Sequence, residues 1–126
     1  MQQNTSQIGK YGEDIALEKY QEMGYTLVTK NFNYYQGDKI GEIDLIVEKN
    51  NILHLVEVKL RKNENFANTL EQITKKKLSC IYKSYLGFVK KYPKYNQYFV
   101  QLDVVTIVNN DIQIYQNCYS FESIIK

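Results

Sequence analysis

The chain has few of the residues that build zinc sites and disulfide frameworks, and it has no long apolar run. It contains one histidine and two cysteines, and Cys80 and Cys118 lack the spacing of metal ligands. We therefore expect both cysteines to be reduced packing residues. No apolar run approaches the ~20 residues of a membrane span. The N-terminal sequence MQQNTSQIGK has no apolar signal core, which predicts a cytoplasmic protein.

Arginine is also scarce, because lysine accounts for fifteen of the sixteen basic residues. This bias favours diffuse attraction to phosphate over bidentate reading of bases. The lysines are unevenly distributed: residues 59–94 contain ten basic and two acidic residues, a net charge of +8, whereas the whole chain carries +2. Such a segment suits contact with a polyanion. An ordinary solvated, lysine-rich helix face has the same composition and remains the alternative.

Composition predicts one globular domain, residues 1–126, since 44% of the chain is apolar and 24% is charged. The sequence contains no internal repeat, low-complexity tract or linker. Residues 1–6 are polar and are expected to be disordered.

Hydrophobic periodicity and turn residues predict the element order α-β-β-β-α-β-β. The expected elements are residues 7–23, 25–34, 42–49, 52–60, 69–92, 98–108 and 112–115. Thr69 and Gln72 fit a capping box at the start of the second helix, and Gly24 and Pro93 are placed to end the two helices. A helix between strands requires a crossover, so this order indicates an α/β fold with a mixed central sheet flanked by helices.

The most informative stretch is residues 41–61, GEIDLIVEKNNILHLVEVKLR. Two strand-like runs flank Asn50-Asn51, a dipeptide suited to a tight hairpin turn. With these asparagines as the loop, Asp44 faces Glu57 across the hairpin, and Lys59 follows on the same face. Two carboxylates on directly opposed residues of a hairpin repel each other, which favours a divalent cation between them. Both runs are almost continuously apolar, so charges placed there need a partner or a metal.

The hairpin leaves an alternative open. Asp44 could lie on a solvent-exposed edge with Glu57 and Lys59 in a surface ladder, and a one-residue shift would move one strand's side chains to the other face. In the favoured register Glu42 faces Lys59, and we expect an ion pair between them. His54 then faces away from the acids and is interpreted as a core or sheet-face residue.

The first helix carries an acidic residue on its apolar face. At 100° per residue, Glu13 falls within the stripe that contains Ala16 and Tyr20. An acid on a buried stripe is unusual without a partner. Glu13 is therefore either a third acid directed at the predicted site, which we favour, or an ion-pair partner of Lys59 or Arg61 at the edge of the core.

Six short blocks occur in one order along the chain: GKYGE at 9–13, GY at 24–25, NF at 31–32, GEIDLI at 41–46, VEVKLR at 56–61 and DVV at 103–105. Over roughly residues 8–108 this series resembles the bacterial YraN family. That family is similar to archaeal Holliday-junction resolvases and belongs with the restriction-endonuclease-like, PD-(D/E)xK, nucleases. The resemblance implies a restriction-endonuclease-like core with a magnesium site at the strand ends.

The resemblance also implies roles for individual residues. Asp44 and Glu57 match the metal-binding acids, and the backbone carbonyl of Val58 matches a further metal ligand. Lys59 matches the lysine that positions or activates the attacking water. Glu13 matches the helix acid of the resolvase-like branch.

Three positions depart from the family pattern. Ile43 stands where the superfamily's name has proline, Leu60 replaces a small polar residue, and Gln101 stands where an arginine often precedes the Asp103 block. These departures leave the acids and the lysine intact but weaken the expected contacts with substrate. For Asp103, within an apolar strand, we expect a structural hydrogen bond.

These features predict a Mg²⁺-dependent endonuclease, with Mn²⁺ as a substitute, that hydrolyses DNA phosphodiester bonds. Branched or structured DNA is the candidate substrate, and the expected DNA-contacting residues are Arg61, Lys62, Lys76 and Lys83. A nucleic-acid-binding module with the same fold and little or no turnover is one alternative. A protein–protein scaffold with purely structural acids is another. The resemblance is compatible with a homodimer, although no sequence feature marks a dimer surface.

Overall fold

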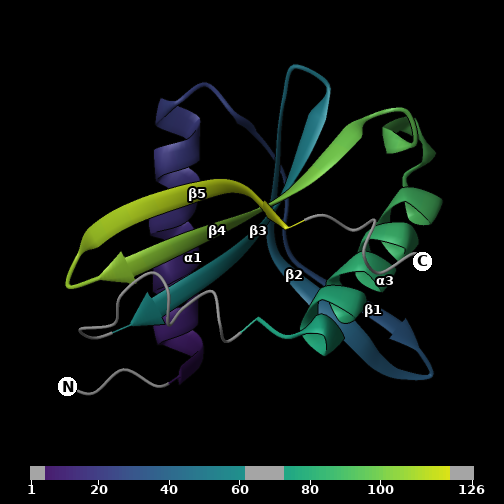
Figure 1. Cartoon of the computed structure of the whole chain (residues 1–126), viewed down its shortest axis with the longest axis horizontal. Helices are drawn as coiled ribbons and strands as arrows, with labels where there is room; N and C mark the ends of the chain where they lie inside the picture. The colour runs from purple at the N-terminus through teal and green to yellow at the C-terminus, as the bar shows by residue number, and fades with distance from the viewer. Residues whose placement is uncertain (1–4, 62–72, 120–126) are drawn as a thin grey trace.

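The computed structural model describes residues 5–61 and 73–119, which form a five-stranded sheet of order β1-β2-β3-β4-β5 between two helices (Figure 1). The elements are α1 (Thr5–Glu22), β1 (Thr26–Gln36), β2 (Asp38–Lys49), β3 (Ile52–Arg61), α3 (Lys75–Lys91), the short 3-10 helix η1 (Pro93–Tyr95), β4 (Phe99–Val108) and β5 (Asp111–Tyr119). The predicted element order and mixed sheet are confirmed: β3 and β4 run parallel, and the other neighbouring strands are antiparallel. Neither α1 nor α3, the helices of the described part, is long and apolar enough to cross a membrane.

Asparagine pairs form both of the two-residue turns that set the sheet register. Asn50 and Asn51 have φ angles of 55° and 63°, and Asn109 and Asn110 have φ angles of 51° and 71°. Positive φ at both central positions is the type I′ geometry that matches the twist of a hairpin. The predicted β2–β3 register follows, with Lys49 opposite Ile52 and Val47 opposite His54.

Several boundaries differ from the predicted ones. Helix α1 begins at Thr5, so only residues 1–4 of the segment predicted to be disordered lie outside the described residues. The predicted capping box at Thr69 and Gln72 also lies outside them. The prediction of one continuous helix from residue 69 is wrong, because Thr74 is extended and its hydroxyl caps α3 by accepting the N–H of Lys77 at 3.1 Å. Strand β5 runs four residues beyond the predicted end at Tyr115.

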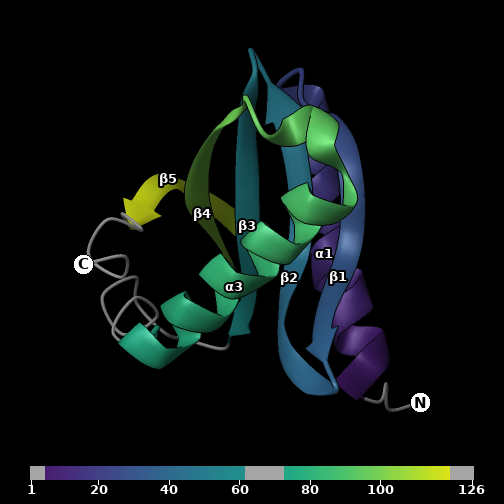
Figure 2. The same ribbon diagram turned by 90° about the vertical axis from the view of Figure 1, so that its right-hand side faces the viewer.

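The sheet is covered on both faces, as its apolar strands predict. Helix α1 packs on one face and α3 on the other, and Figure 2 shows α3 in front of the strands and α1 behind them. The core on the α1 side consists of Ala16, Tyr20, Leu45, Val47, Val56, Val105 and Ile107. The core on the α3 side includes Ile46, Leu53, Leu55, Leu78, Ile81, Phe88 and Leu102. Helix α3 lies against β2 and β1, and α1 lies against β3, β1 and β2, so both helices pack on the strand that carries Asp44.

Gly41 allows β2 to approach α3 closely. A Cβ atom at this position would lie 2.8 Å from the Cys80 carbonyl oxygen and 2.7 Å from Ser84 Oγ. We expect Gly41→Ala to lower the free energy of unfolding by about 1–3 kcal/mol, because backbone atoms must move apart. Gly12→Ala is the control, since its Cβ would meet Val58 at an ordinary 3.4 Å within a helix. Urea denaturation of both variants tests this, and equal midpoints would contradict the close approach.

Candidate functional site

The candidate site lies where β2 separates from β3. The β2–β3 ladder runs from Lys49–Ile52 to Leu45–Val56, and beyond it β2 pairs with β1 as far as Asp38. At this fork, Asp44 takes the place of a ladder partner, because its Oδ2 accepts the backbone N–H of Val58 at 2.9 Å. A backbone donor at the end of the ladder is thus satisfied. This hydrogen bond fixes one carboxylate oxygen of Asp44.

Asp44 and Glu57 interact electrostatically, but the β2–β3 ladder ends at Leu45–Val56, one pair before the predicted Asp44–Glu57 pair. The pKa of Asp44 is raised to about 7, first by burial and then by the negative charge of Glu57, while the hydrogen bond from Val58 opposes both effects. Glu57 is itself only 4% exposed. Two acids therefore share a partly desolvated space, where a positive charge would stabilise both of their ionised forms.

Two ammonium groups face the same oxygen of Glu57. Lys59 Nζ lies 3.4 Å from Glu57 Oε1, and Lys77 Nζ lies 3.6 Å from it. Lys59 was predicted at the site, whereas Lys77 was not. The predicted pair between Glu42 and Lys59 is wrong: Glu42 pairs with Lys39 at 3.1 Å. The cause is the fork, because β2 has left β3 before Glu42 could face Lys59.

Glu13 approaches the fork from α1. Its side chain is 8% exposed and is hydrogen-bonded to the side chain of Asn31. Burial raises the pKa of Glu13, while Asn31 and the charge of Lys30 oppose the rise. The charge of Glu13 in turn raises the pKa of Asp44, so the two acids lie within electrostatic reach. The hydrogen bond of Glu13 is with Asn31 of β1, so its role as an acid directed at the site stays a prediction.

The donor set fits magnesium. Among residues 5–61 and 73–119, no three His, Cys, Asp or Glu side chains gather closely enough to hold an ion by themselves. Mg²⁺, however, is usually bound through one or two carboxylates and retains several waters. Asp44 and Glu57 provide the two carboxylates. The N–H and C=O of one strand residue face the same neighbour, so the Val58 carbonyl oxygen is directed toward Asp44 and can serve as a third ligand.

The predicted DNA-contacting residues are only partly described. Arg61 ends β3, but its side chain and all of Lys62 lie outside the described residues. Lys76 and Lys83 are exposed on α3, seven residues apart. The sequence could have identified Lys77, among the three consecutive lysines, as the one that faces the sheet. At 100° per residue it falls beside Leu78 and Ile81 on the apolar stripe of the helix.

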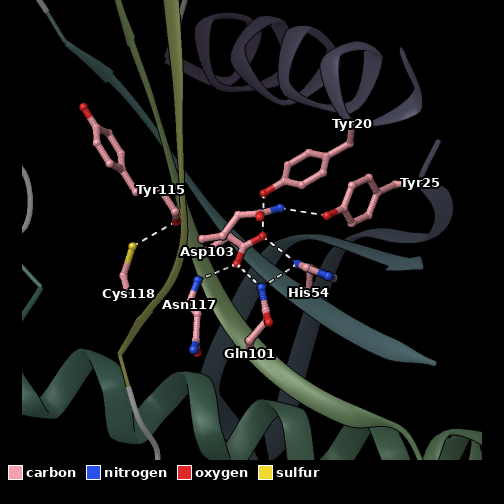
Figure 3. A network of polar contacts seen from close by, with 9 residues as sticks. Tyr20, Tyr25, His54, Gln101, Asp103, Tyr115, Asn117 and Cys118 are labelled. Atoms are coloured by element: carbon pink, nitrogen blue, oxygen red, sulfur yellow. Dashed lines mark hydrogen bonds and ion pairs between the residues drawn. The ribbon is translucent and has the colours of Figure 1, made fainter. Parts of the chain in front are cut away.

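A second polar cluster lies on the α1 side of the sheet, around Asp103 (Figure 3). Asp103 Oδ2 lies 2.8 Å from both the hydroxyl of Tyr20 and Nδ1 of His54. Its Oδ1 accepts from Gln101 Nε2 at 3.1 Å and from the backbone N–H of Asn117 at 3.0 Å. Because a carboxylate only accepts, we assign the His54 proton to Nδ1, toward Asp103. Gln101 Nε2 also lies 3.0 Å from this nitrogen, and in this tautomer it donates to Asp103 alone.

This cluster joins α1, β3, β4 and β5 and is separate from the fork. The prediction that His54 faces away from Asp44 and Glu57 is confirmed, as is the structural hydrogen bond of Asp103. Burial, followed by the charge of Asp103, raises the pKa of Tyr20 above its usual value. Gln101, which departs from the family pattern, holds Asp103 in place.

The raised pKa of Asp44 has a consequence for the metal-free protein. The folded state binds the Asp44 proton more tightly than the unfolded state, so stability falls as pH rises from about 4 to 7. Asp44→Asn cannot ionise but still offers an acceptor to Val58. We expect this variant, in EDTA at pH 8, to be more stable than wild type by roughly 2–4 kcal/mol, with little difference at pH 4.

Urea denaturation between pH 4 and 8 measures this effect. Asp111→Asn, which alters an exposed carboxylate at the start of β5, is the matched control and should follow the wild-type curve. If Asp44→Asn also follows the wild-type curve, Asp44 is not held in the environment described above.

Comparison with known proteins gives one consistent family. The model of the family described as uncharacterised protein family UPF0102 matches residues 12–107, which include every candidate site residue. A UPF0102 protein of Sulfurihydrogenibium sp. (strain YO3AOP1) is 38% identical over 119 residues, 94% of this chain and 99% of its own length. UPF0102 proteins of Acinetobacter baumannii (strain AYE) and Clostridium botulinum (strain Kyoto / Type A2) are 34% and 32% identical. These matches cover 80% and 83% of this chain, and 73% and 82% of the relatives.

Proposed function

This chain belongs to the uncharacterised protein family UPF0102, and we propose that it is a Mg²⁺-dependent endonuclease that hydrolyses DNA phosphodiester bonds. The observation that carries the proposal is the convergence at the β2–β3 fork. The charge of Glu57 helps to raise the pKa of Asp44 there, and Lys59 Nζ lies 3.4 Å from Glu57 Oε1. Strongly perturbed acids with a specific charge partner are typical of functional sites.

The chemistry explains why these groups would be needed together. Hydrolysis requires water to attack a phosphorus atom that is shielded by negatively charged oxygens. A divalent ion held by Asp44 and Glu57 would neutralise that charge and lower the pKa of a bound water. Val58 holds the Asp44 carboxylate in one orientation. The ammonium of Lys59 can orient the nucleophile or stabilise charge that develops on the phosphoryl oxygens.

Glu13 supplies a third acid at the same fork. Its raised pKa makes it a better proton acceptor than an exposed glutamate, so it suits the deprotonation of an attacking water. The sole histidine, His54, is committed to Asp103 and does not compete for this role.

DNA is favoured as the substrate by the lysines of α3. Lys76, Lys83 and Lys90 are exposed and are spaced by seven residues, so they lie along one side of the helix. Seven residues are about two turns, or roughly 10.5 Å, which places positive charges at intervals along a track. Lysines in such a row attract a phosphate backbone without reading its sequence. Branched DNA and a homodimer are proposed on the resemblance to resolvases alone.

A cleavage panel tests this function. Labelled linear, flapped and four-way DNA would each be incubated with the protein in Mg²⁺, in Mn²⁺ or in EDTA. We expect cleavage that requires the metal and is strongest on four-way DNA. Binding without cleavage of any substrate in Mn²⁺ would favour a binding module, and the absence of both would favour a scaffold.

A further inference from the structure

Glu57 is shared by two lysines from different layers of the fold, although one lysine would neutralise it. We propose that Lys77 is a second functional cation of this site. It pairs with Glu57 in the metal-free protein and contacts a substrate phosphate once a divalent ion is bound. This inference rests on the proposed function and adds to it a group from α3.

The position of Lys77 is set by its backbone. Its N–H donates to the Thr74 hydroxyl at 3.1 Å, which fixes the first turn of α3. The buried side chains of Leu78 and Ile81 hold that turn against the sheet. Lys77 is thereby directed toward the face of β3 that displays Glu57, whereas Lys75 and Lys76 are exposed.

The distances indicate pairs that can exchange partners. Charge-assisted N–H···O hydrogen bonds are about 2.7–2.9 Å long. The contacts of Lys59 and Lys77 with Glu57 Oε1 are longer, at 3.4 Å and 3.6 Å. The two side chains differ in exposure, at 18% for Lys59 and 36% for Lys77. Lys77 is therefore more accessible than Lys59 to a ligand arriving from solvent.

Charge determines which partner Lys77 takes. Lys77 and a divalent ion are both cations and compete for the same carboxylate oxygen of Glu57. Lys77, the more exposed ammonium, loses less electrostatic stabilisation than Lys59 when it leaves that oxygen, because solvent already weakens its ion pair. Lys77 is then free, at the edge of the same site, to donate to a phosphate oxygen and stabilise the charge that develops during hydrolysis.

Two measurements on Lys77→Ala test this exchange. Calorimetric titration with Mn²⁺, without DNA, should show binding roughly 2- to 5-fold tighter than wild type, which corresponds to the loss of a partly exposed ion pair. Single-turnover cleavage should be slower by roughly 10²-fold, with little change in the DNA concentration that gives half-maximal rate. Lys77→Arg, which keeps the charge, should restore most of the rate. Lys75→Ala, two residues away on the same turn, should leave both quantities unchanged.

The outcomes separate this inference from the proposed function. If Lys77→Ala matches Lys75→Ala in both measurements while wild type cleaves DNA, Lys77 has no role and the nuclease function stands. Slower cleavage without tighter Mn²⁺ binding would overturn the exchange, and tighter binding with an unchanged rate would overturn the phosphate contact. Wild type that neither binds Mn²⁺ nor cleaves DNA overturns the proposed function and this inference together. Lys77→Gln, which keeps the aliphatic stem, replaces Lys77→Ala if the alanine variant fails to fold.

Discussion

Asp44→Asn is expected to lower the rate of DNA cleavage by about 10³-fold or more, equivalent to roughly 4 kcal/mol of transition-state stabilisation. The substitution removes one of the two proposed metal-binding carboxylates but keeps an acceptor for the Val58 N–H, so the fold should persist. Glu57→Gln should have a similar effect. Single-turnover cleavage of four-way DNA at saturating Mg²⁺ measures the loss.

Lys59→Ala should separate catalysis from metal binding. We expect a loss of roughly 10²-fold in rate without any loss of Mn²⁺ affinity, because Lys59 acts on the reacting groups and its ion pair with Glu57, like that of Lys77, competes with the ion. The control for Asp44→Asn is Asp111→Asn, which removes an exposed carboxylate away from the fork and should cleave DNA at the wild-type rate. Full activity in Asp44→Asn would show that the fork is not where the chemistry occurs.

Asp103→Ala should cost about 3–5 kcal/mol of unfolding free energy, a large share of the stability of a small domain. Asp103 is fully buried and receives hydrogen bonds from Tyr20, His54, Gln101 and the backbone of Asn117. Its removal leaves several of these donors buried without an acceptor. Thermal and urea denaturation would measure the change.

Tyr20→Phe is the matched control, because it removes one donor and leaves Asp103 in place. Its cost should be about 1 kcal/mol. Equal destabilisation by both substitutions would mean that the cluster is not centred on the Asp103 carboxylate. Because the cluster is separate from the fork, folded Asp103→Ala protein should bind Mn²⁺ as wild type does.

The hairpin could be predicted from the sequence because its information is local. Asn50-Asn51 favours a two-residue turn, and the length of that turn sets the β2–β3 register without knowledge of the rest of the fold. The continuous apolar runs on either side predict burial on both faces. The approach of Asp44 to Glu57 follows from these two facts.

The errors arose where distant parts of the chain decide the structure. The fork depends on the long pairing of β2 with β1 and on the contact of Gly41 with α3, neither of which is visible in the hairpin itself. Glu42 was therefore assigned the wrong partner. The start of α3 was misplaced because Thr74, five residues after the predicted cap, is also an acceptable N-cap, and its hydroxyl accepts the N–H of Lys77.

The partners of His54 were hidden for a related reason. Side-chain alternation along β3 predicts that His54 faces away from Glu57. The parallel register that places His54 opposite Gln101, and Val56 opposite Asp103, depends on a crossover through α3 that no local pattern determines. Lys77 was missed likewise, because its contact with Glu57 joins two layers of the fold.

The most direct test of the fork as a metal site is anomalous diffraction from crystals soaked in Mn²⁺. We predict a peak between the Asp44 and Glu57 carboxylates, at about 2.1 Å from an oxygen of each. Well-ordered Asp44 and Glu57 side chains with no peak between them, or a peak only elsewhere in the molecule, would contradict the account.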